Sequence, residues 1–299
     1  MTAPESDMTQ AVPPHIQQIH AYMEAAARQD VAAAADFFAP SLVYRVPGQN
    51  QLSGETTGQQ AALTYFRTMT ERTQGTYGVQ QVQDYLEDAD HVLMLATEHA
   101  SIGSQEHRWD RLILFTFQAG KIQQVELFED AQLALDTFLG RTGPAQDAAQ
   151  AVDAWTPGPP EMSGQMSDPR VQAIMAYQLN VARGDLDAAR TIFDPQVEYH
   201  VSGQNLLAGD YHGPDEVMGY FARLGILTDG TYGISRMRWL TSAKRVALVT
   251  RNHATRQGKR LSWDEVIVFV FQNGKKRRID LFSGDQAGVD VLFGNATAQ

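Results

Sequence analysis

The sequence predicts an α+β fold that is built twice in tandem. The segment 16–140 returns as 171–294, and identical residues recur 155 positions later as far as Tyr77 and 154 positions later from His99 onward. A repeat of this length has the size of a domain and not of a solenoid unit. Within each copy the hydrophobic periodicity changes once, from helical to alternating. We therefore expect two like domains, each with its own core.

Composition sets the expected domain boundaries. Residues 1–14 are polar and predict a disordered tail, residues 15–140 predict the first domain, and residues 169–295 predict the second. Residues 141–168 turn to Gly, Pro, Ala, Ser and Gln, which is typical of a linker. Trp155 is the exception in this segment, because an indole has little reason to lie in a solvated tether. We expect Trp155 to dock on one of the domains.

Each copy opens with helices. Apolar and alanine residues at helical spacing predict a first helix over 15–38, and a second helix is predicted over 59–72. A short extended piece over 42–46 and a glycine-punctuated loop connect them. In the second copy Asp215 and Glu216 follow a proline, an arrangement that suits the first turn of a helix. The helical part of each copy therefore precedes its strands.

Strand signals fill the rest of each copy. Four runs predict strands over 76–86, 92–102, 107–117 and 122–128. Turns that contain glycine separate the last three runs, as expected for hairpins. Helices followed by an antiparallel meander give an α+β layer architecture.

Charge and composition exclude several function classes. The net charge is −11, and residues 1–150 hold 19 acidic against 8 basic side chains, which disfavours a nucleic-acid partner. The basic run 275–278 predicts a solvated strand edge. The absence of cysteine excludes disulfides and thiolate metal sites. Neither a metal nor a cofactor is expected, because the chain has no HExxH motif, no glycine-rich phosphate loop and no ligand spacing among its histidines.

The first residues do not have the pattern of a targeting signal. They have no basic start and no apolar stretch, and no segment elsewhere is apolar over the length that a membrane helix needs. We expect a soluble, cytoplasmic protein without a membrane partner.

Two motifs in each copy resemble a known family. The loop after the extended piece reads YRVPGQNQLSG or YHVSGQNLLAG, and a later strand reads WDRLILFTFQAGKI or WDEVIVFVFQNGKK. With the order of elements, these motifs resemble the SnoaL-like branch of the nuclear transport factor 2-like superfamily. The resemblance implies two cone-shaped α+β barrels, in each of which a long helix closes a strongly curved sheet around a pocket. Members commonly dimerise through the outer sheet face, so it also implies that the two domains pair as an intrachain pseudo-dimer.

The same resemblance implies a small apolar or aromatic molecule as partner. Isomerases, cyclases, dehydratases and pure binding proteins share this scaffold, so the activity has to be read from the pocket residues. No cofactor is implied.

Strand alternation predicts which side chains line the cones. A tight turn at 103–104 sets His99 opposite Trp109, and the next turn sets Glu126 opposite Ile113. The face with these residues is rich in rings, which suits a pocket for a planar apolar ligand. A one-residue shift of register would exchange it for the other face. The predicted pocket residues are Tyr22, Arg45, His99, Trp109, Arg111, Ile113, Glu126, Phe128, Trp263, Glu265, Ile267 and Phe282.

Ketosteroid isomerases share the scaffold, but the resemblance does not carry over all of their catalytic residues. Tyr22 and Tyr177 keep the spacing of the isomerases' oxyanion tyrosine to an aspartate, and such a phenol could donate a hydrogen bond to a carbonyl oxygen. The isomerases' protonated acid falls at Ile113 and Ile267, and their general base falls close to Arg45 in the first copy and His200 in the second. Steroid-isomerase catalysis is therefore not expected.

A different acid–base set is predicted in the second copy. His200 stands where the first copy has an arginine, and it can exchange a proton near neutral pH. His253 and Asp280 could form a base and its orienting carboxylate if both point inward. With Tyr177 as donor, these residues are the predicted catalytic group.

Structural interpretations of the same residues stay open. The tyrosines can be core residues, His253 can pair with a tryptophan across the strands, and Glu126 and Asp280 can lie on the solvent side. The loop glycines are expected to serve backbone geometry, and Asn50 and Asn205 to satisfy loop amides. Three functions remain: cofactor-free isomerisation, cyclisation or dehydration of a small apolar carbonyl compound, binding of such a molecule without turnover, and an interaction or structural protein with filled cones.

Overall fold

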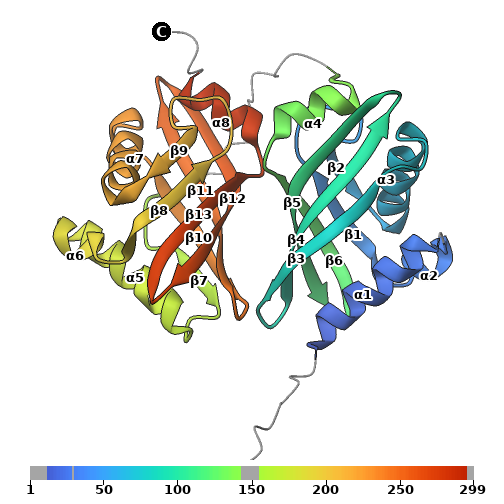
Figure 1. The fold of residues 1–299 in the computed structure, drawn as a ribbon, viewed down its shortest axis with the longest axis horizontal. Coiled ribbons are helices and arrows are strands. Elements are labelled where there is room, and N and C mark those ends of the chain that lie inside the picture. Colours follow the sequence, from blue (N-terminus) through green and yellow to red (C-terminus); the bar gives the residue numbers. More distant parts are fainter. Residues whose placement is uncertain (1–11, 29, 143–154, 295–299) are drawn as a thin grey trace, which may run out of the picture.

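A computed structural model describes residues 12–28, 30–142 and 155–294. These residues form two domains of the same architecture, which lie side by side with their sheets turned toward each other (Figure 1). The predicted tail lies outside the described residues except for its last three positions, and so does the part 143–154 of the predicted linker. None of the helices described is long and apolar enough to span a bilayer.

Domain one begins with helices and ends in an antiparallel meander. Its sheet has the order β2-β1-β6-β5-β4-β3, in which β1 and β6 are parallel and the other neighbours antiparallel. Its elements are α1 (Pro14–Ala27), α2 (Val31–Ala35), β1 (Phe38–Val46), β2 (Gly54–Thr57), α3 (Gln59–Arg72), β3 (Gly78–Glu87), β4 (His91–Ile102), β5 (Gln105–Gln118), β6 (Lys121–Glu129) and α4 (Gln132–Leu139).

Domain two repeats this order after one additional strand. Its sheet runs β10-β11-β12-β13-β8-β9, and β10 meets β3 of domain one at a single residue pair. Its elements are β7 (Glu161–Gly164), α5 (Pro169–Ala182), α6 (Leu186–Arg190), β8 (Phe193–Val201), β9 (Gly209–His212), α7 (Gly213–Leu227), β10 (Gly233–Thr241), β11 (Arg245–Arg256), β12 (Lys259–Gln272), β13 (Lys275–Ser283) and α8 (Gln286–Phe293).

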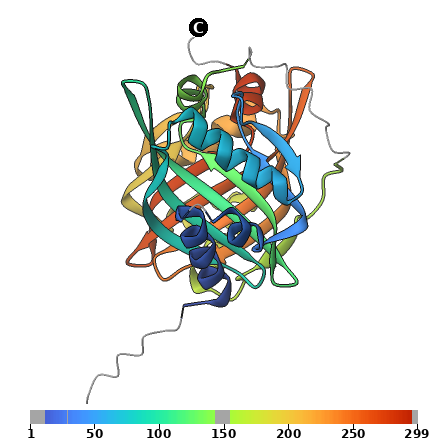
Figure 2. The same ribbon diagram turned by 90° about the vertical axis from the view of Figure 1, so that its right-hand side faces the viewer.

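Each sheet curls around its own helices, and the two outer faces pack together. In domain one, α1 and α3 lie across the concave face of the sheet (Figure 2). The buried apolar residues form one cluster inside each cone and a third cluster between the sheets. The third cluster draws on both domains, with leucines of β3, β4 and β5 against Leu240, Val249, Val266 and Val268. The predicted pair of tandem α+β cones, packed as an intrachain pseudo-dimer, is confirmed.

The predicted first helix is in fact two helices. It breaks after Ala27, and the side chain of Asp30 accepts a hydrogen bond from the Ala33 amide at 3.1 Å to cap α2. Asp185 caps α6 in the same way. An aspartate at this position satisfies a free helix amide, so the backbone turns here instead of continuing the helix. The aspartate eight residues after Tyr22 is thus a helix cap.

The register between β4 and β5 differs by one residue from the prediction. Ile102 pairs with Gln105 across a two-residue turn, so Glu98 lies opposite Trp109 and His99 points to the other face. The prediction placed His99 opposite Trp109 and was wrong. Side chains alternate along a strand, so this single step exchanges a histidine for a glutamate inside the cone.

A β-bulge shifts the next pair of strands. Between Thr116 and Phe117 the pairing with β6 gains one extra residue, Gln123. Beyond it Ile113 lies opposite Leu127, where a regular hairpin would place Glu126. Domain two has the same bulge between β12 and β13. Since a bulge reverses the faces of all following residues, the inward and outward sets of β6 and β13 were predicted the wrong way round.

The predicted linker contributes to domain two. Its residues 161–164 form β7, which pairs in parallel with β10. Trp155 stacks on His253 with ring centroids 4.7 Å apart, and its ring packs against the backbone of Gly233, where a side chain would collide with it. The prediction that this tryptophan docks on a domain is confirmed.

The basic run at the start of β13 is not uniformly solvated. Lys276 is buried, and its Nζ lies 4.4 Å from the ring centroid of Tyr177 and 4.8 Å from that of Phe269. Domain one has the buried Ile122 at this position. Lys276 is paired with Phe271, between the turn and the bulge, and shares the inward face of that residue, so the prediction of a solvated edge was wrong for it.

Candidate functional site

The domain-one cone is filled by an arginine held between two glutamates. Arg111 on β5 is fully buried, with Nη1 2.6 Å from Glu98 on β4 and Nη2 2.7 Å from Glu129 at the end of β6. Arg111 also donates a hydrogen bond to the hydroxyl of Tyr65 at 3.0 Å, and Tyr77 donates one to Glu98 at 3.0 Å. Charged side chains of the protein itself therefore occupy this interior.

This buried group contains two carboxyls and one guanidinium. Burial raises the pKa of Glu98 and raises the pKa of Glu129 to about 7, while the adjacent Arg111 acts against both shifts. One cation cannot neutralise two carboxylates in a low dielectric, so near neutral pH the pair retains part of a proton. The network stabilises a closed interior.

Domain two has other residues at the same three positions. Asn252, Glu265 and Ser283 stand where domain one has its glutamate, arginine and glutamate. Glu265 is buried and accepts a hydrogen bond from Trp263 Nε1 at 3.2 Å. Among the described residues no basic side chain pairs with it, and burial raises the pKa of Glu265 to about 7. The arginine of one cone is thus replaced by a lone acid in the other.

A cavity of about 20 Å³ adjoins Glu265. A space of this size holds one water molecule. Apolar residues close it on the side of α7 and α8, among them Leu224 and Phe293. The polar and aromatic side chains in its wall are Ser202, Asn205, Tyr220, Tyr232, Trp263, Ser283 and Gln286.

One end of each cone is closed by the same hydrogen-bonded loop. In domain two, Asp290 of α8 accepts hydrogen bonds from Asn205 Nδ2 at 2.7 Å and Gln286 Nε2 at 2.9 Å. Gly203 has a φ of +106°, and a side chain there would collide with that glutamine. Asp136 makes the same contacts in domain one. The predicted roles of the loop glycines and asparagines are confirmed at these positions.

Six predicted pocket residues on β5 and β12 do point into the cones. Trp109 and Ile113 belong to the domain-one core, and Trp263 belongs to that of domain two. Ile267 packs against the domain-two core. Arg111 and Glu265 lie between these residues on β5 and β12, as the alternation predicted.

The two predicted donor tyrosines are core residues. Tyr22 packs edge-on against Phe38 at 5.1 Å, and Tyr177 packs edge-on against Phe193 at 5.4 Å. Burial raises the pKa of both phenols above its ordinary value. Tyr177 does not line the cavity beside Glu265, and its role as a donor to a substrate stays a prediction.

His200 and Asp280 lie on the outer sheet face, not in the cone. His200 bridges the domains, with Nδ1 2.6 Å from Asp210 and Nε2 3.1 Å from Asp130 of domain one. These carboxylates raise the pKa of His200 to about 9, so it holds its proton at neutral pH. Asp280 is ion-paired with Arg278 at 2.9 Å. The bulge turns Asp280 outward, and His200 is paired with Asp280 from β8 and shares its face, so the predicted inward placement of both residues was wrong.

The remaining predicted residues also fall outside the cones. His99 is exposed, and His253 is bonded to Ser235 at 2.7 Å and to Ser262 at 2.8 Å beneath the ring of Trp155. The two histidines therefore do not face the indoles of β5 and β12. Four further residues turn outward with their strands. Arg45 and Glu126 form an ion pair, and Phe128 and Phe282 belong to the interdomain cluster.

Sequence reasoning missed the residues that complete both cones. Glu98, Glu129, Asn252 and Ser283 each lie one strand position from a residue that was chosen. Two signals could have found them: a strict two-residue turn at 103–104, and the buried arginine, which demands acidic neighbours. No group of three or more His, Asp or Glu that could hold a metal ion occurs in the part of the chain that the structure describes.

Both domains are similar to proteins of one family. The SnoaL-like domain model matches residues 19–125 and 172–279. An uncharacterised protein of Mycobacterium tuberculosis is 33% identical over 113 residues, which cover 38% of this chain and 86% of that protein. A protein of unknown function with a cystatin-like fold from Xanthomonas campestris is 25% identical, with 42% of this chain and 98% of that chain covered and a TM-score of 0.40. Bal32a, from a soil-derived mobile gene cassette, is 28% identical, with 42% and 96% covered and a TM-score of 0.40.

Proposed function

This chain belongs to the SnoaL-like domain family, and on that premise we propose that its second domain binds a small, largely apolar carbonyl compound and exchanges a proton with it through Glu265. The observation that carries the proposal is a buried carboxyl beside a cavity, without a paired cation among the described residues. Domain one has the ion-paired Arg111 at that position and serves as a scaffold.

The chemistry follows from the environment of Glu265. A carboxyl with a pKa near 7 populates both protonation states at neutral pH, as a general acid–base catalyst requires. The carboxylate would remove a proton from the carbon next to the carbonyl, and the acid so formed would return it to the same or a neighbouring position. Tyr232 lines the cavity, and its hydroxyl, which donates to Asn252 Oδ1 at 3.3 Å, would turn its proton to the substrate oxygen as that oxygen gains charge.

A substrate has to widen this cone before it can bind. The cavity holds one water molecule, and side chains of α7 and α8 close it. Leu224, Val289 and Phe293 are the apolar members of this closure. Their outward movement would admit a ring or short chain beside Glu265 and leave the sheet in place.

Deuterium exchange tests the proposal directly. Enolisable ketones such as 2-tetralone, incubated with the protein in D₂O, are expected to exchange the protons beside the carbonyl faster than without it, as followed by proton NMR. Glu265→Gln should lower the catalysed rate by about 100-fold or more. The matched control is Glu126→Gln, which changes a carboxylate outside the cone and should keep the full rate. Equal rates in the two variants would show that Glu265 is not the exchanging group.

The pKa of Glu265 has a consequence without substrate. A folded pKa of about 7, above the ordinary 4.5, means that the folded state binds the proton more tightly than the unfolded chain. The contribution of this group to stability is therefore greatest below pH 4.5 and is lost as the pH rises through about 7, a change of about 3 kcal/mol. Urea unfolding of Glu265→Gln should lack this fall. An identical pH profile in both proteins would contradict the assignment.

A further inference from the structure

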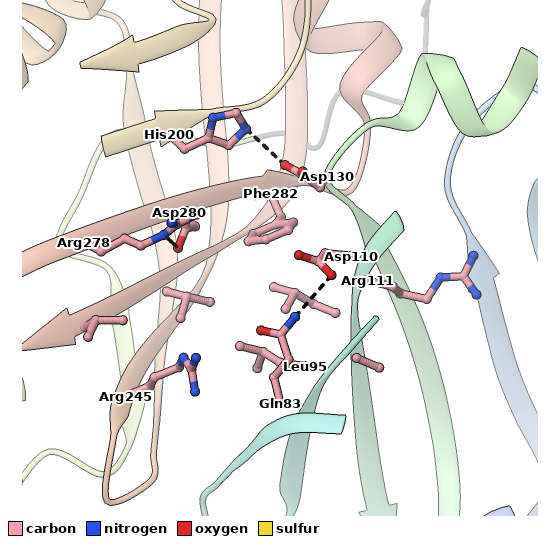
Figure 3. A pocket seen from close by; sticks show the side chains of 14 residues that line it. Gln83, Leu95, Asp110, Arg111, Asp130, His200, Arg245, Arg278, Asp280 and Phe282 are labelled. Carbon is pink, nitrogen blue, oxygen red and sulfur yellow. Dashed lines mark hydrogen bonds and ion pairs between the residues drawn. The ribbon is translucent and has the colours of Figure 1, made fainter. Parts of the chain in front are cut away.

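A second hollow lies between the domains and away from both cones. Its volume is about 380 Å³, within the range of small-molecule sites. The outer faces of both sheets line it, and the side chain of Arg111 points away from it (Figure 3). This space belongs to the pair of domains and to neither domain alone.

An apolar stretch crosses the middle of this cavity. Leu95 and Leu112 contribute to it from domain one, and Val268 and Phe282 from domain two. All four belong to the hydrophobic cluster that holds the sheets together. In Figure 3 the ring of Phe282 lies between Asp110 and the ion pair of β13. The polar groups are thus separated into two sets by apolar surface.

Two acidic residues stand on the domain-one side. The Asp130 amide donates a hydrogen bond to the carbonyl of Asp110 at 3.3 Å, so the two carboxylates are cross-strand neighbours, a costly arrangement for like charges. Asp110 accepts hydrogen bonds from the neutral donors Thr97 at 2.6 Å and Gln83 at 3.2 Å. The equivalent Asp264 of domain two is ion-paired with two arginines. The domain-one carboxylate lacks such a cation among the described residues.

Two arginines stand on the domain-two side. Arg245 on β11 and Arg278 on β13 are both strand partners of Val270, so they flank it on the same face, roughly 10 Å apart by the strand spacing. Among the described residues Arg245 donates one side-chain hydrogen bond, from Nη1 to Asp84 at 2.9 Å. A guanidinium has five N–H donors, so both arginines keep donors for a ligand. Domain one has His91 in place of the first arginine and a glutamine in place of the second.

We propose that the interdomain cavity binds a zwitterionic small molecule. Its ammonium group contacts Asp110 and Asp130, its carboxylate contacts Arg245 and Arg278, and its apolar middle lies across Phe282. An ammonium group near this ring would also gain a cation–π attraction. The contacts on both walls tie the ligand to the paired state of the domains.

The balance of charge supports a ligand with both signs. Apart from the arginine that points away, the lining holds three basic side chains and three acidic ones. The third basic side chain, His200, is already ion-paired with Asp130, and the third acidic one, Asp280, is ion-paired with Arg278. A purely anionic molecule would leave Asp110 of domain one without a partner, and a purely cationic one would leave Arg245 of domain two without one.

Calorimetric titration with matched probes tests the proposal. The probes are γ-aminobutyrate, δ-aminovalerate and ε-aminocaproate, each compared with the acid and the amine of the same chain length. At least one zwitterion is expected to bind about tenfold or more tighter than both of its analogues, because each lost charge-assisted hydrogen bond weakens binding by that order. The variants Asp110→Asn and Arg278→Gln should each bind the zwitterion more weakly by a similar factor.

Two control variants make the outcome decisive. Asp264→Asn changes the symmetry-equivalent carboxylate outside the cavity, and it should bind the zwitterion as the parent protein does. Glu265→Gln alters the cone alone and should also bind it unchanged. The proposal is overturned if no zwitterion binds tighter than its analogues, or if the double variant Asp110→Asn/Arg278→Gln binds the zwitterion as tightly as the parent protein. It is also overturned if Glu265→Gln abolishes zwitterion binding.

Discussion

The two cones share one backbone plan and differ in what fills them. In domain one, Arg111 is held by Glu98 and Glu129 and donates a further hydrogen bond to the hydroxyl of Tyr65. In domain two, the corresponding positions hold Glu265 and the neutral Asn252 and Ser283, and Glu265 and Ser283 line a small cavity. Three substitutions therefore separate a closed, charge-paired interior from a hollow one with a titratable acid.

This difference teaches that fold and pocket chemistry are set by different residues. The hydrogen bond from Asn50 to Asp136, which holds the loop in domain one, recurs between Asn205 and Asp290 in domain two. These residues define the backbone in both halves. The positions of Glu98, Arg111 and Glu129 and their counterparts in domain two do not hold this loop, so their side chains could diverge without loss of the fold.

The largest effect is expected from breaking the domain-one network. Arg111→Met would leave Glu98 and Glu129 buried without their cation and should lower the free energy of unfolding by about 3–5 kcal/mol. Urea unfolding at pH 7 measures it. Glu98→Gln/Arg111→Met/Glu129→Gln removes all three charges and should recover most of the loss. A single variant as stable as the parent would mean that the network does not stabilise this cone.

A second comparison concerns the buried lysine of domain two. Burial lowers the pKa of Lys276 to about 7 from 10.5, which corresponds to about 5 kcal/mol against the charged form. Its contacts with aromatic rings offset about 2 kcal/mol of this. Lys276→Ile copies Ile122 of domain one, and it should stabilise the protein by about 3 kcal/mol at pH 6.

The pH dependence of this variant checks the cause. The unfolded chain binds the lysine proton more tightly, so the penalty is complete below pH 7 and is relieved as the pH rises toward 10.5. The advantage of Lys276→Ile should therefore vanish above pH 10.5 in thermal unfolding followed by circular dichroism. A constant advantage at all pH values would point to packing instead of charge.

The smallest effect is expected at the bridge between the domains. His200 occupies the position of Arg45, which is always charged and pairs with Glu55 and Glu126 within its own domain. The pKa of His200 is raised to about 9 from 6.5, so its ion pairs stabilise the fold fully below pH 6.5 and are lost as the pH rises through about 9. The side chain is 36% exposed, and screening limits the contribution to about 1 kcal/mol.

The variant His200→Asn measures how much these ion pairs contribute to stability. It should destabilise the protein by about 1 kcal/mol at pH 6 and by almost nothing at pH 10, as followed by urea unfolding. Arg45→Gln is the matched variant in domain one, and its effect should not change between these pH values. A loss that is equal at both pH values for His200→Asn would exclude the charged bridge.

Much of the architecture was predictable from the sequence. The repeat fixes two like domains, and the periodicity gives the strands from β3 to β6 within a few residues of their ends. The alternation along β5 and β12 placed Trp109, Arg111, Trp263 and Glu265 inside the cones. These predictions rest on local pattern, because a strand with one face in a core shows it in every second residue.

Which residues line the cones depends on strand pairing, and strand pairing is not a property of the local sequence. One residue in a turn exchanged His99 for Glu98, and one bulged residue turned Glu126 and Asp280 outward. Nothing in the local pattern marks a bulge, because both faces of these strands are apolar, one against the helices and one against the other sheet.

The sequence by itself determined that the chain has two α+β halves and which strand faces carry rings. Only the tertiary structure decided that one cone is closed by Arg111, that Glu265 has no paired cation among the described residues, and that His200 links the domains. The physical reason is that burial and charge pairing depend on which strands become neighbours, and a single step of register changes every such neighbour.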